Sequence, residues 1–261
     1  MKKRRILYLK AVAYDDLNDA IKNYLDAYKD DKTEIVVRSI PYGPKHLEYQ
    51  YYQALAAPLM LKEVLRAKKE GFDAVIISCF DDPALYPARE ICGNMIITAP
   101  GEASMTLASV LGDRFSVIVG RDKWIPQMRR NAIRYGLERK CVSFRSLGMG
   151  VLDFHADEKV TIGKMKEEIR QAIEKDLAEV IILGCTMQFG FYKEIQEEFD
   201  VPVIDSMIAA LKHAEYLIEM REKTGVFFSR RGLYEAPEAE EMREWNIEED
   251  FGLDGLLYND Q

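Results

Sequence analysis

Cysteines are the side chains best suited to chemistry in this sequence, and two of the four stand in matching places. Cys79 lies near the end of Gly71-Phe-Asp-Ala-Val-Ile-Ile-Ser-Cys79-Phe, and Cys185 near the end of Asp176-Leu-Ala-Glu-Val-Ile-Ile-Leu-Gly-Cys185-Thr. A thiolate can remove a proton from carbon, and a thiol on the opposite side of the same molecule can return one. Two cysteines that face one ligand from opposite sides would therefore racemise or epimerise it without a cofactor.

Both cysteines follow a polar lead-in and an apolar run, and both precede a helix-forming segment, Pro83–Ile91 or Phe189–Phe199. Ligands of open parallel sheets bind outside the carboxyl ends of the strands. The amides and dipole of a following helix favour a thiolate, so we expect these helices to favour the thiolate form. The alternative for any single strand-end cysteine is burial in the core, but the repeated setting favours function. Cys92 and Cys141 lack this setting and are assigned to packing.

The elements that must position the two cysteines alternate along the chain. Apolar runs typical of strands covered on both faces are Ile6–Val12, Glu34–Ile40, Ala74–Cys79, Met95–Thr98, Phe115–Val119, Val142–Leu147, Val180–Leu183 and Val201–Ile204. Segments with apolar residues at helical spacing are Ala57–Lys69, Lys164–Leu177 and Met207–Arg221. The alternation predicts an α/β fold with mostly parallel sheets, and the repeat around the two cysteines predicts two similar halves.

We expect three parts in the chain. Residues 1–98 together with 206–225 form the first α/β domain, because a helix after Ile204 can return to the first half. Residues 99–205 form the second domain, and residues 226–261 form an acidic C-terminal extension. The segment Glu235–Asp250 is rich in acidic residues. It is either a solvated helical tail or an arm that packs on a partner subunit through Trp245, Phe251 and Leu256, and the sequence leaves both open.

Composition limits the function classes. The formal net charge of −8 argues against nucleic acid or an anionic membrane as the main partner. No apolar stretch reaches the roughly 18 residues of a membrane span, and the start MKKRRILYLKAVAYDD lacks the apolar core of a signal peptide. We therefore expect a cytoplasmic protein with reduced thiols. The cysteines and the three histidines lack the spacing of metal ligands, and neither GxGxxG nor GxxxxGK[ST] occurs.

Four motifs, in this order, resemble those of the aspartate/glutamate/hydantoin racemase superfamily, and most closely those of its hydantoin racemase branch. The first is Ser78-Cys79-Phe80-Asp81-Asp82-Pro83-Ala84-Leu85 with Ala88-Arg89-Glu90, the second is Gly101-Glu102-Ala103, and the third is Leu183-Gly184-Cys185-Thr186-Met187. The fourth is Val201-Pro202-Val203-Ile204-Asp205, followed by Ala209-Ala210 and Ala214-Glu215. The resemblance covers residues 5 to 220, roughly.

This resemblance implies two pseudo-symmetric Rossmann-like (flavodoxin-like) domains with the active site in a cleft between them. It implies that Cys79 and Cys185 are the acid/base pair and that no metal, pyridoxal phosphate or nucleotide takes part. It also implies a homo-oligomer and a small-molecule substrate with a carbonyl or carboxylate. The substrate-binding positions that it suggests are Val12, Phe80, Asp81, Glu102, Gly120, Arg121, Thr186 and Met187.

The sequence departs from the family pattern in two places. The family's Asn-Pro-Asn-Thr loop after the first strand is replaced by Leu9-Lys10-Ala11-Val12-Ala13-Tyr14, and two threonines of the second domain are replaced by Gly120-Arg121. Arg121 either pairs with a substrate carboxylate or is an exposed residue at a helix start. Asp81 and Asp82 either cap the helix near Pro83, or Asp81 polarises Cys79. Glu102 also fits a first helical turn, where its charge is favoured.

The sequence thus predicts a cofactor-independent racemase that inverts a carbon next to a carbonyl, with 5-substituted hydantoins or related cyclic ureides as substrates. Two alternatives within the superfamily remain, an aspartate or glutamate racemase and a maleate-type cis-trans isomerase. A third alternative, from another class, is a non-catalytic protein that binds a small molecule between its two lobes.

Overall fold

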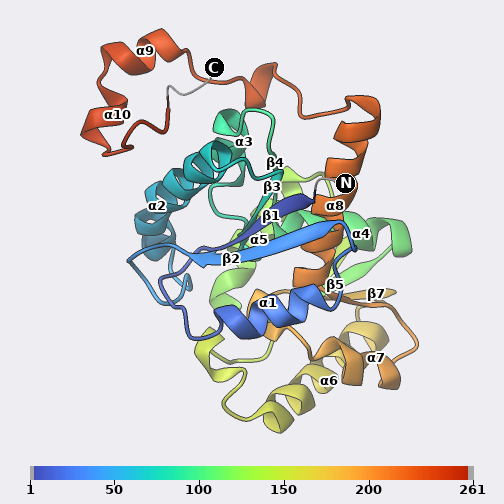
Figure 1. The fold of residues 1–261 in the computed structure, drawn as a ribbon. Coiled ribbons are helices and arrows are strands. Elements are labelled where there is room, and N and C mark those ends of the chain that lie inside the picture. Colours follow the sequence, from blue (N-terminus) through green and yellow to red (C-terminus); the bar gives the residue numbers. More distant parts are fainter. Residues whose placement is uncertain (1–2, 258–261) are drawn as a thin grey trace.

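Two four-stranded parallel sheets form the frame of the protein in the computed structural model, which describes residues 3–257 (Figure 1). The first has the order β2-β1-β3-β4, with β1 at Arg4–Lys10, β2 at Thr33–Ser39, β3 at Ala74–Ser78 and β4 at Ile96–Thr98. The second has the order β6-β5-β7-β8, with β5 at Phe115–Val119, β6 at Cys141–Ser146, β7 at Val180–Leu183 and β8 at Val203–Asp205. The second order repeats the first, four strands later, which confirms the predicted α/β fold with two similar halves.

Helices flank both sheets and fill the stretches between the strands (Figure 1). The helices of the two halves are α1 (Asn18–Asp26), α2 (Gln50–Lys69), α3 (Leu85–Ile91), α4 (Pro100–Leu111), α5 (Ile125–Arg134), α6 (Glu158–Glu174), α7 (Tyr192–Glu198) and α8 (Ser206–Thr224). Four 3-10 turns are η1 (Asp122–Trp124), η2 (Val151–Asp153), η3 (Thr186–Gln188) and η4 (Gly232–Tyr234). The short helices α9 (Ala239–Glu244) and α10 (Ile247–Asp250) follow near the C-terminus.

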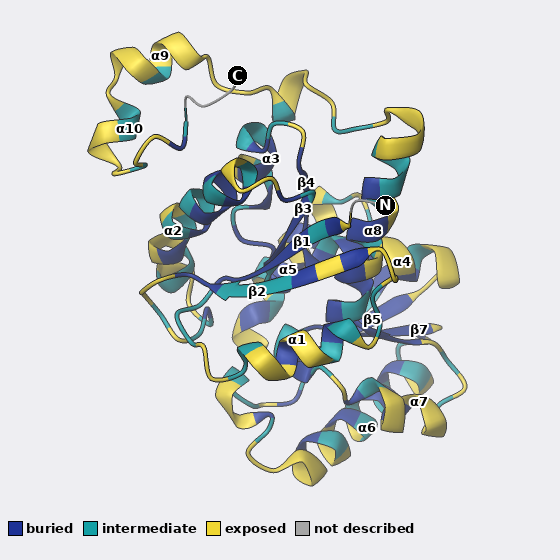
Figure 2. Ribbon diagram, in the orientation of Figure 1, coloured by how far each residue is buried: buried dark blue, intermediate teal, exposed yellow. Residues whose placement is uncertain are grey.

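The central strands are buried on both faces (Figure 2). Every residue of β5 is buried, and so is every residue of β7. On the first sheet, Leu7 and Leu9 pack toward α2, whereas Ile6 and Tyr8 pack toward α1 and α8. Each large apolar side chain that leaves water in this way contributes about 1.5–3 kcal/mol. The continuous apolar runs in the sequence are therefore explained by helices on both faces.

Helix α8 begins in the second half and packs on the first sheet. Its first turn is capped by the Asp205 carboxylate, which accepts hydrogen bonds from the backbone N–H groups of Met207 and Ile208. Its buried stripe joins the cluster that contains Ile6 and Tyr8. The helix ends at Gly225, whose φ of 75° is the left-handed conformation that favours glycine.

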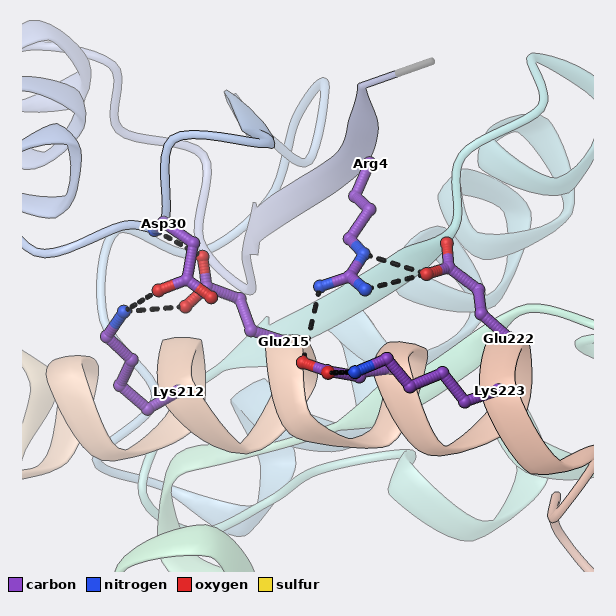
Figure 3. Close-up of polar contacts among 7 residues, drawn as sticks. Arg4, Asp30, Lys212, Glu215, Glu222 and Lys223 are labelled. Atoms are coloured by element: carbon purple, nitrogen blue, oxygen red, sulfur yellow. Dashed lines mark hydrogen bonds and ion pairs between the residues drawn. The ribbon is translucent and has the colours of Figure 1, made fainter. Parts of the chain in front are cut away.

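Ion pairs fasten the outer side of α8 to the first half (Figure 3). The Arg4 guanidinium of β1 donates two hydrogen bonds to the Glu222 carboxylate. The buried Glu215 carboxylate accepts from the backbone N–H of Asp30 at 2.8 Å and from Lys212 at 2.8 Å, and Lys212 also reaches Asp30 at 2.6 Å. These contacts hold the chain's last long helix against its first strand and the loop before its second.

The C-terminal extension lies along α2 and α3. The Tyr234 hydroxyl meets the Arg89 guanidinium of α3 at 2.9 Å, and Lys62 of α2 pairs with Asp254 at 2.8 Å. Leu256 is buried within the chain, whereas Trp245 and Phe251 are exposed. Within residues 3–257, no helix combines the length and the apolar character needed to cross a membrane.

The contacts of Glu215 predict how much this side chain contributes to the free energy of unfolding of the protein. Glu215→Ala removes a buried acceptor and leaves the Asp30 N–H unpaired, so we expect the free energy of unfolding to fall by about 1–3 kcal/mol. Urea denaturation followed by circular dichroism measures it. Glu219→Ala is the matched control, because the Glu219 side chain lies on the same helix, is 41% exposed and is 3.8 Å from Arg4. An equal or larger loss in the control would contradict the assignment.

Candidate active site

The two cysteines line the same cavity between the sheets. Cys79 follows β3 of the first sheet, and Cys185 follows β7 of the second. The cavity measures about 90 Å³, which suits a small ligand. Other residues of its wall come from the end of β1, from the loop before α2 and from η2 and η3: Tyr8, Lys10, Val12, Lys45, His46, Glu48, Val151, Leu152, Thr186 and Met187. The site therefore stands where the carboxyl ends of parallel strands from the two sheets meet.

The loop after Cys79 is fastened to the second half by Asp82. The buried Asp82 carboxylate accepts from the backbone N–H groups of Gly101 and Glu102 at 2.7 and 2.6 Å, and from the Tyr135 hydroxyl at 2.6 Å. Burial raises the pKa of Asp82 to about 7, and these donors counteract that rise. A Cβ atom on Gly101 would lie 2.5 Å from the backbone oxygen of Phe80, so only glycine allows this close approach.

This arrangement corrects one sequence interpretation. Neither Asp81 nor Asp82 caps α3, which begins at Leu85 after Ala84 in a left-handed conformation and has no side-chain cap. Asp82 instead caps α4, whose N-terminal amides come within reach because the two halves pack together. Its partners lie 19 and 20 residues away in the chain, beyond what local capping patterns reveal.

Cys185 is placed by a second close approach. A Cβ atom on Gly184 would lie 2.4 Å from a methyl group of Val117, so glycine lets the chain leave β7 against the neighbouring strand. The turn η3 follows at once. His155 holds that turn, because its Nε2 lies 2.9 Å from the backbone oxygen of Met187 and its ring stacks on Phe191.

The structure also corrects the expectation that helices favour both thiolates. Cys79 is followed by a turn and Cys185 by η3, so neither thiol meets the N-terminus of an α-helix. Burial raises the pKa of the Cys79 thiol well above its usual value, and the charge of Asp81 raises it further. Burial also raises the pKa of Cys185 to about 12, and the backbone N–H of Met187 counteracts part of that rise. Both groups are therefore thiols at neutral pH.

Asp81 and Trp124 present polar atoms that no other described residue satisfies. Asp81 Oδ2 accepts from the Gln53 amide at 2.6 Å, but the buried Asp81 Oδ1 has no hydrogen-bond partner within residues 3–257. The buried Trp124 Nε1 likewise has none. Both residues line the cavity. Burial raises the pKa of Asp81 to about 6, against the effect of the Gln53 bond. Two residues of the cavity wall thus each hold one buried polar atom without a hydrogen-bond partner, an acceptor on Asp81 and a donor on Trp124.

The rim of the cavity joins the two halves through Glu48. Its carboxylate pairs with Arg121 at 2.5 Å and accepts from the backbone N–H of Val151 at 2.7 Å. The loop that carries Glu48 belongs to the first half, whereas Arg121 and Val151 belong to the second. The loop is therefore fixed across the cavity mouth.

Five of the eight substrate-binding positions expected from the sequence line the cavity with the cysteines: Val12, Phe80, Asp81, Thr186 and Met187. The other three lie outside its wall. Glu102 pairs with the Arg89 guanidinium, Gly120 packs under the Trp124 ring, and Arg121 pairs with Glu48. Within residues 3–257, no three His, Cys, Asp or Glu side chains gather as they do at a metal site.

Sequence reasoning missed several residues of the cavity wall. Tyr8 lies on a central strand, reads as core in the sequence, and accepts a 2.6 Å hydrogen bond from Ser78. Lys10 gave a signal, because a charge interrupts the apolar run at the end of β1. Trp124 gave none, because the 3-10 turn η1 places it at the cavity and no sequence motif marks it.

Comparisons with known proteins agree with this geometry. A family model described as Asp/Glu/Hydantoin racemase matches residues 14–214. The hydantoin racemase of Pseudomonas sp. (strain NS671) is 34% identical over 209 residues, which are 80% of this chain and 82% of that protein.

Two solved structures have the same architecture. The allantoin racemase from Klebsiella pneumoniae superposes with a TM-score of 0.82 at 26% identity, over 90% of this chain and 94% of that one. The allantoin racemase from Pseudomonas fluorescens superposes with a TM-score of 0.83 at 29% identity, over 89% and 97%. The match to the family model and the identity to a curated relative lead to one conclusion: the chain belongs to the Asp/Glu/hydantoin racemase family and is an isomerase of the racemase type.

Proposed function

We propose that this protein racemises 5-substituted hydantoins or related cyclic ureides, with Cys79 and Cys185 as its acid/base pair and without a cofactor. The observation that carries the proposal is the shared cavity, because one thiol comes from each half of a repeated fold. The relatives named hydantoin racemase and allantoin racemase support the substrate class.

In the proposed reaction, one cysteine acts as a thiolate and removes the hydrogen on the ring carbon next to a carbonyl. The electron pair of the C–H bond moves into the ring as an enolate, and the proton goes to sulfur. The opposite thiol then donates its proton to the other face of that carbon and becomes a thiolate. The product is the mirror-image centre, and the two cysteines have exchanged protonation states, so the next turnover runs in reverse.

The raised pKa values of the two thiols suit this step. A base with a raised pKa is a stronger base, and a carbon acid needs a strong one. In a cyclic ureide, the carbonyl beside the reacting carbon acidifies the hydrogen on that carbon. This narrows the difference between the pKa of the C–H group and the pKa of the thiol. The cost is that only a small fraction of the thiols is ionised at neutral pH.

The unused polar atoms of the wall suit a ureide. A cyclic ureide presents N–H donors and C=O acceptors on one planar ring. Asp81 Oδ1 is a buried acceptor for an N–H group, and Trp124 Nε1 is a buried donor for a carbonyl oxygen that gains charge in the enolate. Thr186 and Met187 follow Cys185 and supply further contacts.

The two-cysteine proposal predicts how single variants behave. Cys79→Ser and Cys185→Ser should each lower racemisation at least about 100-fold, because serine is too weak an acid to replace the thiol. Each variant keeps one base, so each should still exchange the hydrogen of one enantiomer for deuterium, and the two variants should prefer opposite enantiomers. Proton NMR in heavy water measures this on hydantoins, allantoin, aspartate, glutamate and maleate.

Cys141→Ala is the matched control, because Cys141 is buried away from the cavity. A reaction without enzyme corrects for spontaneous exchange. If both serine variants exchange both enantiomers at the wild-type rate, the two-cysteine mechanism is wrong. Isomerisation of maleate without any exchange would favour the isomerase alternative, and stabilisation by a ligand without turnover would favour a binding protein.

The role of Trp124 is tested by removing one N–H group. Trp124→Phe keeps an aromatic ring but loses the donor, so we expect kcat/KM for a hydantoin to fall about tenfold, the equivalent of one hydrogen bond. Trp245→Phe is the control, because Trp245 is the other tryptophan and is exposed on the extension. Equal activity of Trp124→Phe and wild type would remove Trp124 from substrate binding.

The thiol pKa values predict the pH dependence of alkylation. Iodoacetamide reacts with thiolates, and the pKa values of both cysteines are raised, so their labelling should keep accelerating up to at least about pH 9.5. Peptide mass spectrometry after short pulses measures each site, with glutathione as the internal standard. A plateau below about pH 8 at either cysteine would show an activated thiolate and contradict the effect of burial.

A further inference from the structure

Lys10 brings an ammonium group into a cavity wall that is otherwise largely apolar on this side. It is the last residue of β1 and pairs in register with Ser78, the residue before Cys79. Side chains alternate along a strand, so Lys10 shares a sheet face with Tyr8, and both line the cavity. Lys10 thus stands beside the reacting cysteine of the first half.

The charge of Lys10 has no direct counter-charge. The residue is 4% exposed. Its Nζ donates to the backbone oxygen of Tyr14 and, at 2.8 Å, to Asn18 Oδ1, which are both neutral acceptors. Asp15 and Asp16 act on it through space, and within residues 3–257 no carboxylate forms an ion pair with it. An ammonium has three N–H donors; the two neutral acceptors account for two of them, and the Tyr14 ring lies 5.4 Å from Nζ.

A buried ammonium without a charged partner is unfavourable. Burial lowers the pKa of Lys10, and the two aspartates oppose that effect without cancelling it. Buried charges in proteins are normally paired or bound to an ion of opposite charge. An anion on a ligand in the cavity would satisfy both the charge and the third donor.

Neither carboxylate of the cavity wall pairs with Lys10. Glu48 is held by Arg121 and by the backbone N–H of Val151, and Asp81 is bonded to Gln53. Lys45 adds a second cation at the exposed rim of the wall. The cavity wall therefore holds two cations, Lys10 and Lys45, that form no ion pair with its two carboxylates.

We infer that Lys10 binds a carboxylate carried by the substrate, so that the enzyme prefers cyclic ureides with an acidic substituent on the reacting carbon. This inference rests on the proposed racemase function and narrows its substrate class. The site is the end of β1, where Lys10 interrupts an apolar run. Lys10 would fix the substituent and thereby orient the ring carbon between the two thiols.

Two matched substrates separate charge from shape. Hydantoin-5-acetic acid and hydantoin-5-acetamide have the same size, but only the acid is charged at pH 7.5. We expect wild type to prefer the acid in kcat/KM, and Lys10→Gln to lower kcat/KM for the acid about 10- to 100-fold, the range of a hydrogen bond to a charged group. For the amide the change should stay below about threefold. Lys10→Met serves as a second variant, and Lys22→Met, an exposed lysine on α1, is the control.

The competing explanation is that Lys10 only holds the loop after β1. Loss of that support would lower turnover of the acid and of the amide equally. If kcat/KM falls by the same factor for the acid and for the amide in both Lys10→Gln and Lys10→Met, the inference is overturned. Equal use of both substrates by wild type would overturn it as well, while leaving the racemase proposal intact. If wild type turns over neither of these two substrates, the racemase proposal is decided by the other hydantoins and by allantoin, and the inference on Lys10 is decided by binding. Calorimetry then decides on Lys10: tighter binding of the acid that Lys10→Gln abolishes supports it, and equal binding of acid and amide overturns it.

Discussion

The position of the loop after Cys79 depends on the hydrogen bonds that the buried Asp82 carboxylate accepts from the first turn of α4. Its bonds to the amides of Gly101 and Glu102 and to the Tyr135 hydroxyl fix the loop after Cys79 onto the second half. These bonds act together with the contacts of Glu48 to Arg121 and Val151, which also join the two halves at the cavity. Burial raises the pKa of Asp82, and each of its three donors stabilises the charged carboxylate against that effect.

The repeat of the fold explains why the two thiols meet. Both sheets have the same strand order, and in each the cysteine follows the third strand in chain order. Packing the carboxyl ends of these strands around one cavity places both cysteines in its wall. The environments are not identical, because Asp81 stands next to Cys79, whereas the η3 amide of Met187 moderates the pKa of Cys185.

Much of the fold could be predicted from the sequence, because the strands are short, apolar and buried on both faces. The runs Phe115–Val119 and Val180–Leu183 coincide with β5 and β7 to the residue. The predicted starts of the two helices after the cysteines were less accurate. The predicted helix at Pro83 begins at Leu85, because Asp82 and Ala84 both have positive φ, and the one at Phe189 begins at Tyr192, because η3 comes first.

The candidate site was predictable only in part. Cys79 and Cys185 gave a sequence signal through their repeated setting. The thiol pKa directions, the partner of Asp82 and the role of Glu48 depend on contacts between the halves, which no local pattern contains. Lys10 illustrates the difference: the sequence shows a charge in an apolar run, but only the structure shows that it is buried at the cavity without a counter-charge.

The central claim is that two bases act on opposite faces of one carbon, and the position of deuterium in early turnover tests it most directly. A single enantiomer of a 5-substituted hydantoin is converted in heavy water to a few per cent, separated by chiral chromatography and analysed by mass spectrometry. Two bases predict deuterium in nearly all of the product and in almost none of the remaining substrate, after correction for spontaneous exchange. Equal deuterium in product and remaining substrate would show a single base and contradict the account.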